Sequence, residues 1–397
     1  MATPRDKRNV LVLAVCQALF ITGFGVMFLV GPLVAAPILG DDLTFITLPF
    51  SMMLFGLAAA TWPAARLMQR IGRKFGFAIG STLGAGGCAI AYYAILHGNL
   101  VAFSAGLFLF GIYTGFGKQY RFAAADAAAG DFKATAISLV LAAAVIGGFA
   151  GPELEKYTRT LLAGGEFAGT MAGVMALTLV SGLVILAIDI PKLGRAELAD
   201  EARPMSTIAR QPAFIADADA GALGYVTMNL TMTSAPIAMR LGNGFAFDDA
   251  AFVIQWHTIG MFAPGFFTGH LIKLWGPVRV IMAGGILMLG TVGIAVSGVT
   301  LMHFWLSMFA VGLAWNFTFT GATALLIQIH KPSERANVQG VNDLIIFTLL
   351  SLTSLTSGML YHFAGWNILV LTALPIIAIM LVIVLGLAPK NRRQPAV

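Results

Sequence analysis

The segment Ala65-Arg66-Leu67-Met68-Gln69-Arg70-Ile71-Gly72-Arg73 has a counterpart later in the chain, Gly269-His270-Leu271-Ile272-Lys273-Leu274-Trp275-Gly276-Pro277. The two copies start at positions 65 and 269, so about half of the 397-residue chain separates them. Each copy follows a long apolar stretch. Similarity at such a distance indicates an internal repeat. The sequence therefore predicts two halves with the same arrangement of helices.

The composition is that of a membrane protein. Hydrophobic residues make up 58% of the chain and charged residues 11%, and the mean hydropathy is +0.86. Soluble proteins carry about 25% charged residues. With roughly 20 residues per membrane-spanning helix, the length allows about twelve spans. These are predicted at 10–30, 45–65, 76–97, 100–120, 134–152, 167–189, 213–239, 250–273, 278–299, 304–328, 338–361 and 366–388.

The longest polar stretch, Pro191 to Arg210, follows the sixth predicted span. It predicts three parts: a six-helix bundle at 1–190, a linker at 191–211 and a second six-helix bundle at 212–397. The fold class is therefore an all-α membrane protein of twelve helices. Of the 24 Lys and Arg residues, 21 fall in segments on the side of the termini. This excess predicts that both termini and the linker are cytoplasmic.

Several functional classes are disfavoured. The net charge of +6 lies in loops between apolar spans, which is how membrane topology distributes it, so nucleic-acid binding is not expected. No nucleotide-binding loop, catalytic triad or HExxH motif occurs, so we expect neither an enzyme nor a resident cofactor. Cys16 and Cys88 lie inside apolar runs and are expected to be packing residues.

Two pairs of soft or nitrogen ligands lie in neighbouring spans. Met228 and Met232 share one helix face in the seventh span, and His257 and Met261 share one face in the eighth. Thioether sulfur suits Cu(I), and imidazole also binds copper. From the predicted spans, all four lie within roughly 9 Å of the bilayer midplane. They are predicted to form one metal site. Met171 and Met175 have the same spacing without a histidine and serve as an internal control.

Other polar residues have predicted roles around this site. Asn229 and Gln255 neighbour the four ligands and are candidates for orienting them. Asp217, Asp219 and Asp343 lie near the cytoplasmic ends of their spans, where solvated or gate-lining roles are expected. Lys118 and Arg121 are expected to extend to the membrane surface.

Two motifs resemble those of the major facilitator superfamily. The run from Arg66 to Lys74 is similar to its loop between helices two and three, although Gln69 replaces the usual Asp. The resemblance implies gating roles for this loop and for the start of helix eleven; the candidates are Arg66, Arg70, Arg73, Lys74 and Asp343. Gly147-Gly148-Phe149-Ala150-Gly151-Pro152 resembles the Gly-Pro motif of antiporters without its trailing glycines, and is interpreted as a packing and kink element.

A closer resemblance is to the CcoA-like copper importers, a bacterial branch of that superfamily. It is carried by Thr227-Met-Asn-Leu-Thr-Met-Thr-Ser-Ala-Pro236, by Val253-Ile-Gln-Trp-His-Thr-Ile-Gly-Met-Phe-Ala-Pro264 and by Val338-Gln-Gly-Val-Asn-Asp343. A sister branch that imports riboflavin is similar overall but lacks the Met and His pairs.

The resemblance implies a monomeric importer in the bacterial inner membrane that carries copper, as an ion or a small chelate, by alternating access. Two alternatives remain open. One is a carrier of a small organic substrate such as riboflavin, a siderophore or a drug. The other is a membrane metal sensor that binds without transport.

Overall fold

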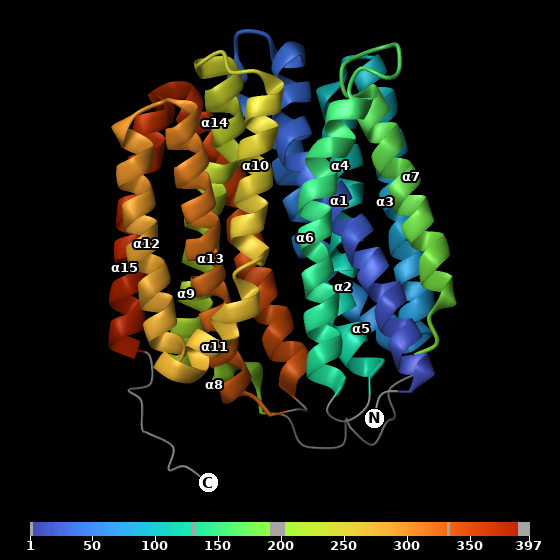
Figure 1. Ribbon diagram of the computed structural model, residues 1–397, viewed down its shortest axis with the longest axis vertical. Coiled ribbons are helices and arrows are strands. Elements are labelled where there is room, and N and C mark those ends of the chain that lie inside the picture. Colours follow the sequence, from blue (N-terminus) through green and yellow to red (C-terminus); the bar gives the residue numbers. More distant parts are fainter. Residues whose placement is uncertain (1–2, 129–131, 191–202, 332–333, 388–397) are drawn as a thin grey trace.

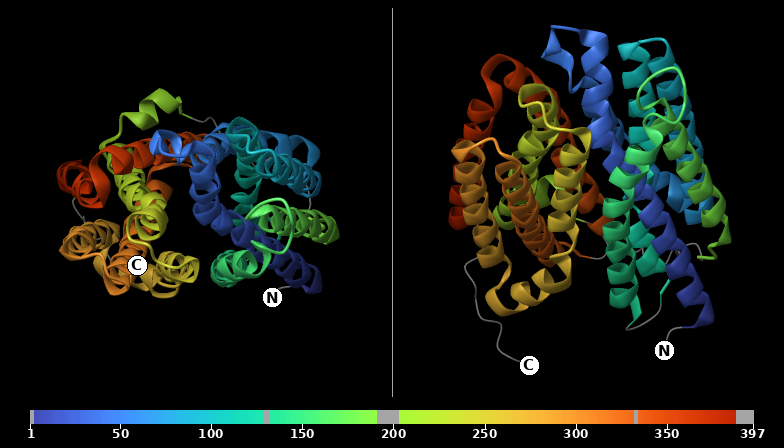
Figure 2. Two further views of the ribbon diagram at one scale, coloured as in Figure 1. Left: turned by 90° about the horizontal axis from the view of Figure 1, so that it is seen from above. Right: turned by 45° about the horizontal axis from the view of Figure 1, so that its top comes forward.

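A computed structural model describes residues 3–128, 132–190, 203–331 and 334–387. Within these residues the chain forms helices and no strands. Figure 1 shows two groups of long, roughly parallel helices side by side, and Figure 2 shows the same division from above.

The first group is the N-terminal bundle. Its helices are α1 (Pro4–Leu39), α2 (Leu48–Ile71), α3 (Arg73–Leu96), α4 (Leu100–Gly117), the short α5 (Tyr120–Asp126), α6 (Phe132–Thr158) and α7 (Ala168–Val184). The second group is the C-terminal bundle. Its helices are α9 (Pro212–Ile237), α10 (Phe247–Phe262), α11 (Gly265–Trp275), α12 (Pro277–Ser297), α13 (Leu301–Ile329), α14 (Arg335–Leu371) and α15 (Ala373–Leu387).

The prediction of twelve spans is confirmed. Nine helical segments among the described residues are long and apolar enough to cross a membrane. The remaining three spans are α9, which carries Asp217 and Asp219, the pair α10–α11, and the shorter apolar α15. The eighth span is broken because Pro264 offers no backbone N–H and disrupts the helix; α10 ends at Phe262 and α11 begins at Gly265.

The internal repeat is visible in the turns that it predicts. Gly72 separates α2 from α3 with φ 95° and ψ 157°, and Gly276 separates α11 from α12 with φ 82° and ψ 158°. Each donates its N–H over 2.9 Å to a carbonyl four residues earlier. Because these dihedrals favour glycine, both copies need it at this position.

Helix contacts within each bundle also repeat. A side chain at Gly56 of α2 would clash with the Phe108 carbonyl of α4. A side chain at Gly260 of α10 would lie 2.5 Å from the Phe309 carbonyl of α13. Small residues let membrane helices approach closely, and here they join corresponding helices of the two bundles.

The bundles meet along α2 with α14 and along α6 with α10. At the end far from the chain termini, Thr47 donates a hydrogen bond to the Leu355 carbonyl over 3.2 Å. There too, the guanidinium of Arg159, which directly follows α6, lies 4.1 Å from the centre of the Phe247 ring of α10. Side chains from both bundles therefore pack together at that end.

The predicted linker lies partly outside the described residues, which resume at 203. From there it contains the short helix α8 (Met205–Ala209). Figure 1 places α8 at the end of the molecule where α1 begins. The predicted division at 190 and 212, and the cytoplasmic placement of this end, stay predictions.

Candidate metal and substrate site

His257 is the most informative of the predicted ligands. It lies on α10, its side chain is 1% exposed, and its Nδ1 is 2.7 Å from the Met308 carbonyl oxygen of α13. A carbonyl oxygen only accepts, so we infer that Nδ1 carries the proton. Nε2 then has a free lone pair, and it has no hydrogen-bond partner in the part of the chain that the structure describes. Metal-binding histidines have this arrangement, in which one nitrogen is held by a carbonyl and the other can bind a metal.

Both helices that carry the predicted pairs, α9 and α10, contact α13, so the depths of the two pairs can be compared along it. A side chain at Gly312 would lie 2.6 Å from the His257 carbonyl oxygen and 3.1 Å from the Met261 nitrogen, so α10 crosses α13 here. On α9, a side chain at Gly224 would lie 2.6 Å from Thr318 Oγ1. Gly224 therefore faces α13 as well, and Met228 follows it by about one helical turn.

This geometry places the four residues at similar depths. Helices α9 and α13 run antiparallel, so Met228 and Met232 are level with about residues 314 and 310 of α13. His257 and Met261 are level with Met308 and Gly312. The four positions span about 9 Å along α13 at 1.5 Å per residue. That all four bind one ion stays a prediction.

Burial alone does not distinguish these residues from ordinary core. Met228, Met232 and Met261 are buried, but so is Met171 of the control pair. Both cysteines are buried, as expected for packing residues, and the Cys16 thiol lies 3.7 Å from the Ser181 carbonyl oxygen. The unpartnered imidazole nitrogen of His257, at a depth similar to that of the methionines, is what marks the predicted site.

The two residues predicted to orient the ligands have other partners. Asn229 donates to the Leu350 carbonyl of α14 over 3.3 Å and accepts from the Thr233 hydroxyl. Gln255 Nε2 lies 3.5 Å from the Phe149 carbonyl of α6, in the other bundle. These contacts tie α9 to α14 and α10 to α6. A role in orienting the ligands stays a prediction.

The gating candidates divide into two groups. Arg73 binds Asp126 of its own bundle, with Nη2 2.8 Å from Oδ2. Arg66 stacks on Trp62. Arg70 lies near the end of α2 and Lys74 near the start of α3, on either side of the turn at Gly72. In contrast, Asp343 of α14 pairs with Arg121 of the N-terminal bundle at 3.8 Å. Of these contacts, the Arg121–Asp343 pair joins the two bundles.

The expectation that Lys118 and Arg121 extend to the membrane surface is wrong. Arg121 turns toward Asp343. The Lys118 ammonium lies 5.4 Å from the Phe24 ring centre and 5.6 Å from the Phe347 ring centre, which belong to different bundles. The bundle interface offers these cations a carboxylate and aromatic faces, so both charges are held between the bundles.

Two buried carboxylates differ from the sequence expectation. Asp217 is 1% exposed, not solvated, and among the described residues neither carboxylate oxygen has a hydrogen-bond partner. Glu155 of α6 is equally buried and was missed, because the predicted span ended at residue 152 whereas α6 continues to Thr158. Ionisable groups buried within a membrane often have functional roles.

Sequence reasoning also missed an aromatic cluster at the same depth. The Tyr225 ring of α9 lies 5.0 Å from the Trp315 ring and 5.7 Å from the Phe319 ring, both on α13. Trp315 also approaches Phe262, and its Nε1 is buried without a partner among the described residues. Aromatic faces pack well against planar ring systems. Since the cluster comes from separate helices, no local pattern indicates it.

Comparison with known proteins agrees with this architecture. The model of the family described as Major Facilitator Superfamily matches residues 13–349 and 218–397. The chain belongs to the major facilitator superfamily. It is therefore a multi-pass membrane transporter, and proteins of this superfamily are generally carriers without enzymatic activity.

Named relatives of this transporter extend over almost its whole length. The riboflavin transporter RfnT of Brucella anthropi is 38% identical over 393 residues, 98% of each chain. An uncharacterized MFS-type transporter of Bacillus subtilis, YdeG, is 26% identical over 89% of this chain and 86% of its own. The human organic anion transporter MFSD10 has a TM-score of 0.72 and covers 96% of this chain and 100% of its own. At 15% identity it shows the fold alone.

Proposed function

We propose that this protein imports copper across the bacterial cytoplasmic membrane by alternating access between its two bundles. The observation that carries the proposal is His257, whose Nδ1 is held by the Met308 carbonyl while Nε2 is buried and unpartnered. Three methionines on α9 and α10 lie within about 9 Å of His257 along the helix axis. Thioethers and a neutral imidazole form a donor set suited to copper, and the site needs no carboxylate.

The rest of the proposal follows from the carrier architecture. Copper is the cargo, as an ion or a small chelate, and the protein acts as a monomer in the lipid bilayer with its termini in the cytoplasm. Alternating access would expose the same Met and His residues first to one side of the membrane and then to the other. Because the four residues stay together while the two bundles move against each other, the metal can cross without a resident cofactor.

Riboflavin is a second candidate cargo, and the relative RfnT, a riboflavin transporter, favours it over copper. RfnT is similar along its full length. The cluster of Tyr225, Trp315 and Phe319 could also stack on a planar ring system. RfnT and the aromatic side chains support riboflavin, whereas the buried donor atoms support copper. A copper importer and a riboflavin importer of these two branches would both be similar to RfnT overall. We therefore base the proposal on the donor atoms of the Met and His side chains and not on overall similarity.

A direct comparison of the two cargoes tests the proposal. The purified protein is placed in liposomes, and uptake of copper and of riboflavin is measured in parallel by elemental analysis and by flavin fluorescence. We expect copper to accumulate and excess riboflavin to leave copper uptake unchanged. Accumulation of riboflavin without copper would establish the second candidate. Copper binding without accumulation would instead indicate a sensor.

A further inference from the structure

The break between α10 and α11 lies next to one of the proposed metal ligands. Met261 is the next-to-last residue of α10, three residues before Pro264. Beyond the break, Phe266 donates its N–H over 3.2 Å to the carbonyl of Ala263, three residues back, where an α-helix reaches four. Helices bend at proline breaks of this kind. The break therefore separates α11 from the part of the span that carries His257 and Met261.

Helix α11 has little buried surface to hold it in place. All of its residues are described, and among them only Thr268 is buried. Phe266 is 74% exposed and Leu274 is 62% exposed. Figure 1 shows α11 at the end of the C-terminal bundle that lies on the side where α1 begins. Segments with few buried contacts are those that open or move at low cost.

The side chain of Asn316 on α13 bridges the break. Its Nδ2 donates to the Met261 carbonyl oxygen over 2.7 Å, and its Oδ1 accepts from the Thr268 hydroxyl over 2.7 Å. A carbonyl oxygen only accepts, so it fixes which end of the amide faces Met261. Asn316 is 6% exposed and Thr268 is fully buried. Asn316 thus joins the backbone of a proposed metal ligand to the buried residue of α11.

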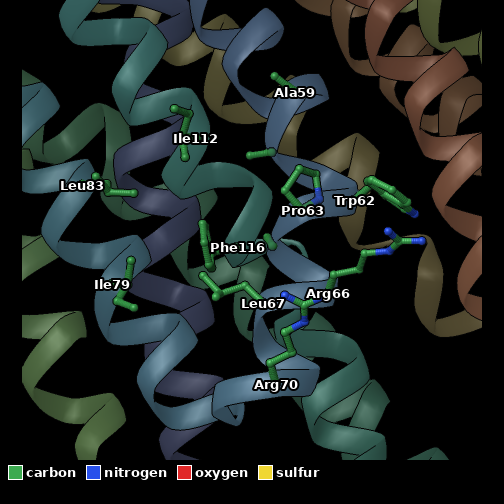
Figure 3. Close-up of a pocket in the computed structure, with 12 residues that line it drawn as sticks. Ala59, Trp62, Pro63, Arg66, Leu67, Arg70, Ile79, Leu83, Ile112 and Phe116 are labelled. Atoms are coloured by element: carbon green, nitrogen blue, oxygen red, sulfur yellow. The ribbon is translucent and has the colours of Figure 1, made fainter.

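The N-terminal bundle has different residues at the matching positions of the broken span. In the aligned segments, Ala60 stands in place of Pro264, and Ala64 stands in place of Thr268. There α2 is one continuous helix, which includes Pro63. Figure 3 shows this part of α2 passing beside α4 without interruption. The break is therefore not a feature that the repeat imposes on both bundles.

The bridging residue also differs between the bundles. A side chain at Gly115 of α4 would lie 3.3 Å from the Thr61 nitrogen of α2. A side chain at Gly265, the counterpart of Thr61 in the aligned segments, would lie 3.9 Å from Asn316 Nδ2. Gly115 therefore occupies the place of Asn316 in the N-terminal bundle. Glycine has no side chain with which to bridge two parts of a helix.

We propose, building on the copper function proposed above, that Asn316 positions Met261 and couples it to α11, which turns about Pro264 when the metal binds or leaves. Asn316 holds the Met261 backbone and does not itself bind the metal. A shift of that backbone passes through two buried hydrogen bonds to Thr268. A few residues at the end of an element commonly serve as the hinge of such movements. Movement of α11 then opens the site toward the side where α1 begins.

Hydrogen–deuterium exchange of the full-length protein in detergent tests the coupling. Amide exchange is followed by mass spectrometry over 265–275 and over the matching 61–71 of α2, with and without Cu(I). We expect copper to change exchange in 265–275 and to leave 61–71 unchanged. Thr268→Val removes one hydrogen bond and should speed exchange of α11 in metal-free protein roughly fivefold, and Asn316→Leu, which removes both, roughly twentyfold. The change caused by copper should be lost in both variants.

Uptake into liposomes separates coupling from a structural role. Thr268→Val should lower the maximal rate of copper uptake roughly fivefold, and the half-saturating copper concentration should stay unchanged because the Met and His ligands remain. Thr268→Ser keeps the hydroxyl and should transport like the parent. The matched control is Thr61→Val, which removes a buried hydroxyl of α2 that bonds the Leu57 carbonyl of its own helix over 2.8 Å. It should also transport like the parent.

The outcomes distinguish this coupling from the copper function itself. Binding of Cu(I) is measured by competition with a coloured Cu(I) chelator, and thermal unfolding confirms that each variant is folded. If the parent binds Cu(I) and exchange in α11 does not change, the coupling is refuted and copper transport stands. If the parent binds no Cu(I), both are refuted. An equal loss of rate in Thr61→Val, or slow uptake by Thr268→Ser, would also refute the coupling, since the hydroxyl of Thr268 would then act through packing alone.

Discussion

The two bundles share their backbone plan but differ in the polar residues placed on it. Gly72 and Gly276 make the same turn, and Gly56 and Gly260 make equivalent close contacts. The unpartnered imidazole of His257 belongs to the C-terminal bundle alone, because the matching residue of the N-terminal bundle is Met53, which is fully buried. Shared positions thus specify the fold, and positions that differ between the bundles are where function should be sought.

The two methionine pairs also show that bundles with similar sequence patterns can differ in function. Met171 and Met175 on α7 and Met228 and Met232 on α9 have identical spacing. Both pairs contribute to the hydrophobic core. The second pair lies at a depth similar to that of His257, whose Nε2 has no hydrogen-bond partner among the described residues. If the proposal is right, the two pairs should respond very differently to the same substitution.

The largest expected effect is on copper accumulation. Met261→Leu and His257→Gln should each lower it by on the order of tenfold or more, as loss of a metal-supporting residue does elsewhere. Met→Leu preserves apolar volume, so the free energy of unfolding should change by less than about 1.5 kcal/mol. Lowering the pH should partly mimic His257→Gln, because a protonated imidazole cannot bind metal. Accumulation is measured in cells at equal membrane expression.

The control variants for this experiment lie in the N-terminal bundle. Met171→Leu and Met175→Leu should accumulate copper like the parent, since that pair lies on α7, in the other bundle from His257. If Met261→Leu and His257→Gln also match the parent, the metal site is refuted. The methionines would then be apolar packing in a carrier of another substrate, and riboflavin would be the next cargo to test.

A smaller effect is expected at the ion pair between the bundles. Arg121 and Asp343 are partly buried, with side chains 28% and 14% exposed, and the repeat places Leu325 and Leu139 at the matching positions. Arg121→Gln or Asp343→Asn leaves the other charge without its partner, so each should lower initial uptake by roughly two- to fivefold. The double variant should be no slower than the slower single variant. Multiplying effects in the double variant would show that the two residues act independently.

The sequence predicted features that depend on local patterns. Apolar stretches located the spans, and the repeated glycine located the turns at Gly72 and Gly276. It did not predict the Arg121–Asp343 pair or the edge-to-face packing of Tyr225 on Trp315, because these contacts join residues far apart in the chain. Glu155 was missed because the predicted span ended at residue 152, whereas α6 continues to Thr158. Tertiary packing overrides the local signal at such places.

The two bundles also differ in the ion pairs close to the linker. In the N-terminal bundle, Arg5 pairs with Asp189, and both side chains are largely exposed, at 48% and 62%. In the C-terminal bundle, Arg203 of the linker binds Glu334 over 2.7 Å, and the Glu334 side chain is 1% exposed. Exposed ion pairs contribute little to stability. We therefore expect Glu334→Gln to lower the melting temperature at pH 7 and Asp189→Asn to leave it nearly unchanged.

The smallest effect predicted is the pH dependence of the difference in melting temperature between the parent and Glu334→Gln. The hydrogen bond from the Arg203 guanidinium, with one from the Lys331 N–H, holds the pKa of the Glu334 carboxyl well below its usual range. In the unfolded chain this pKa is about 4.3. A carboxyl whose pKa is lowered by folding stabilises the protein above its unfolded pKa, and this stabilisation is lost as the pH falls toward the folded value. The difference in melting temperature between parent and Glu334→Gln should thus stay constant from pH 7 to about pH 5 and shrink below about pH 4.3. A difference that is unchanged down to pH 3 would show that Glu334→Gln acts through packing, not through charge.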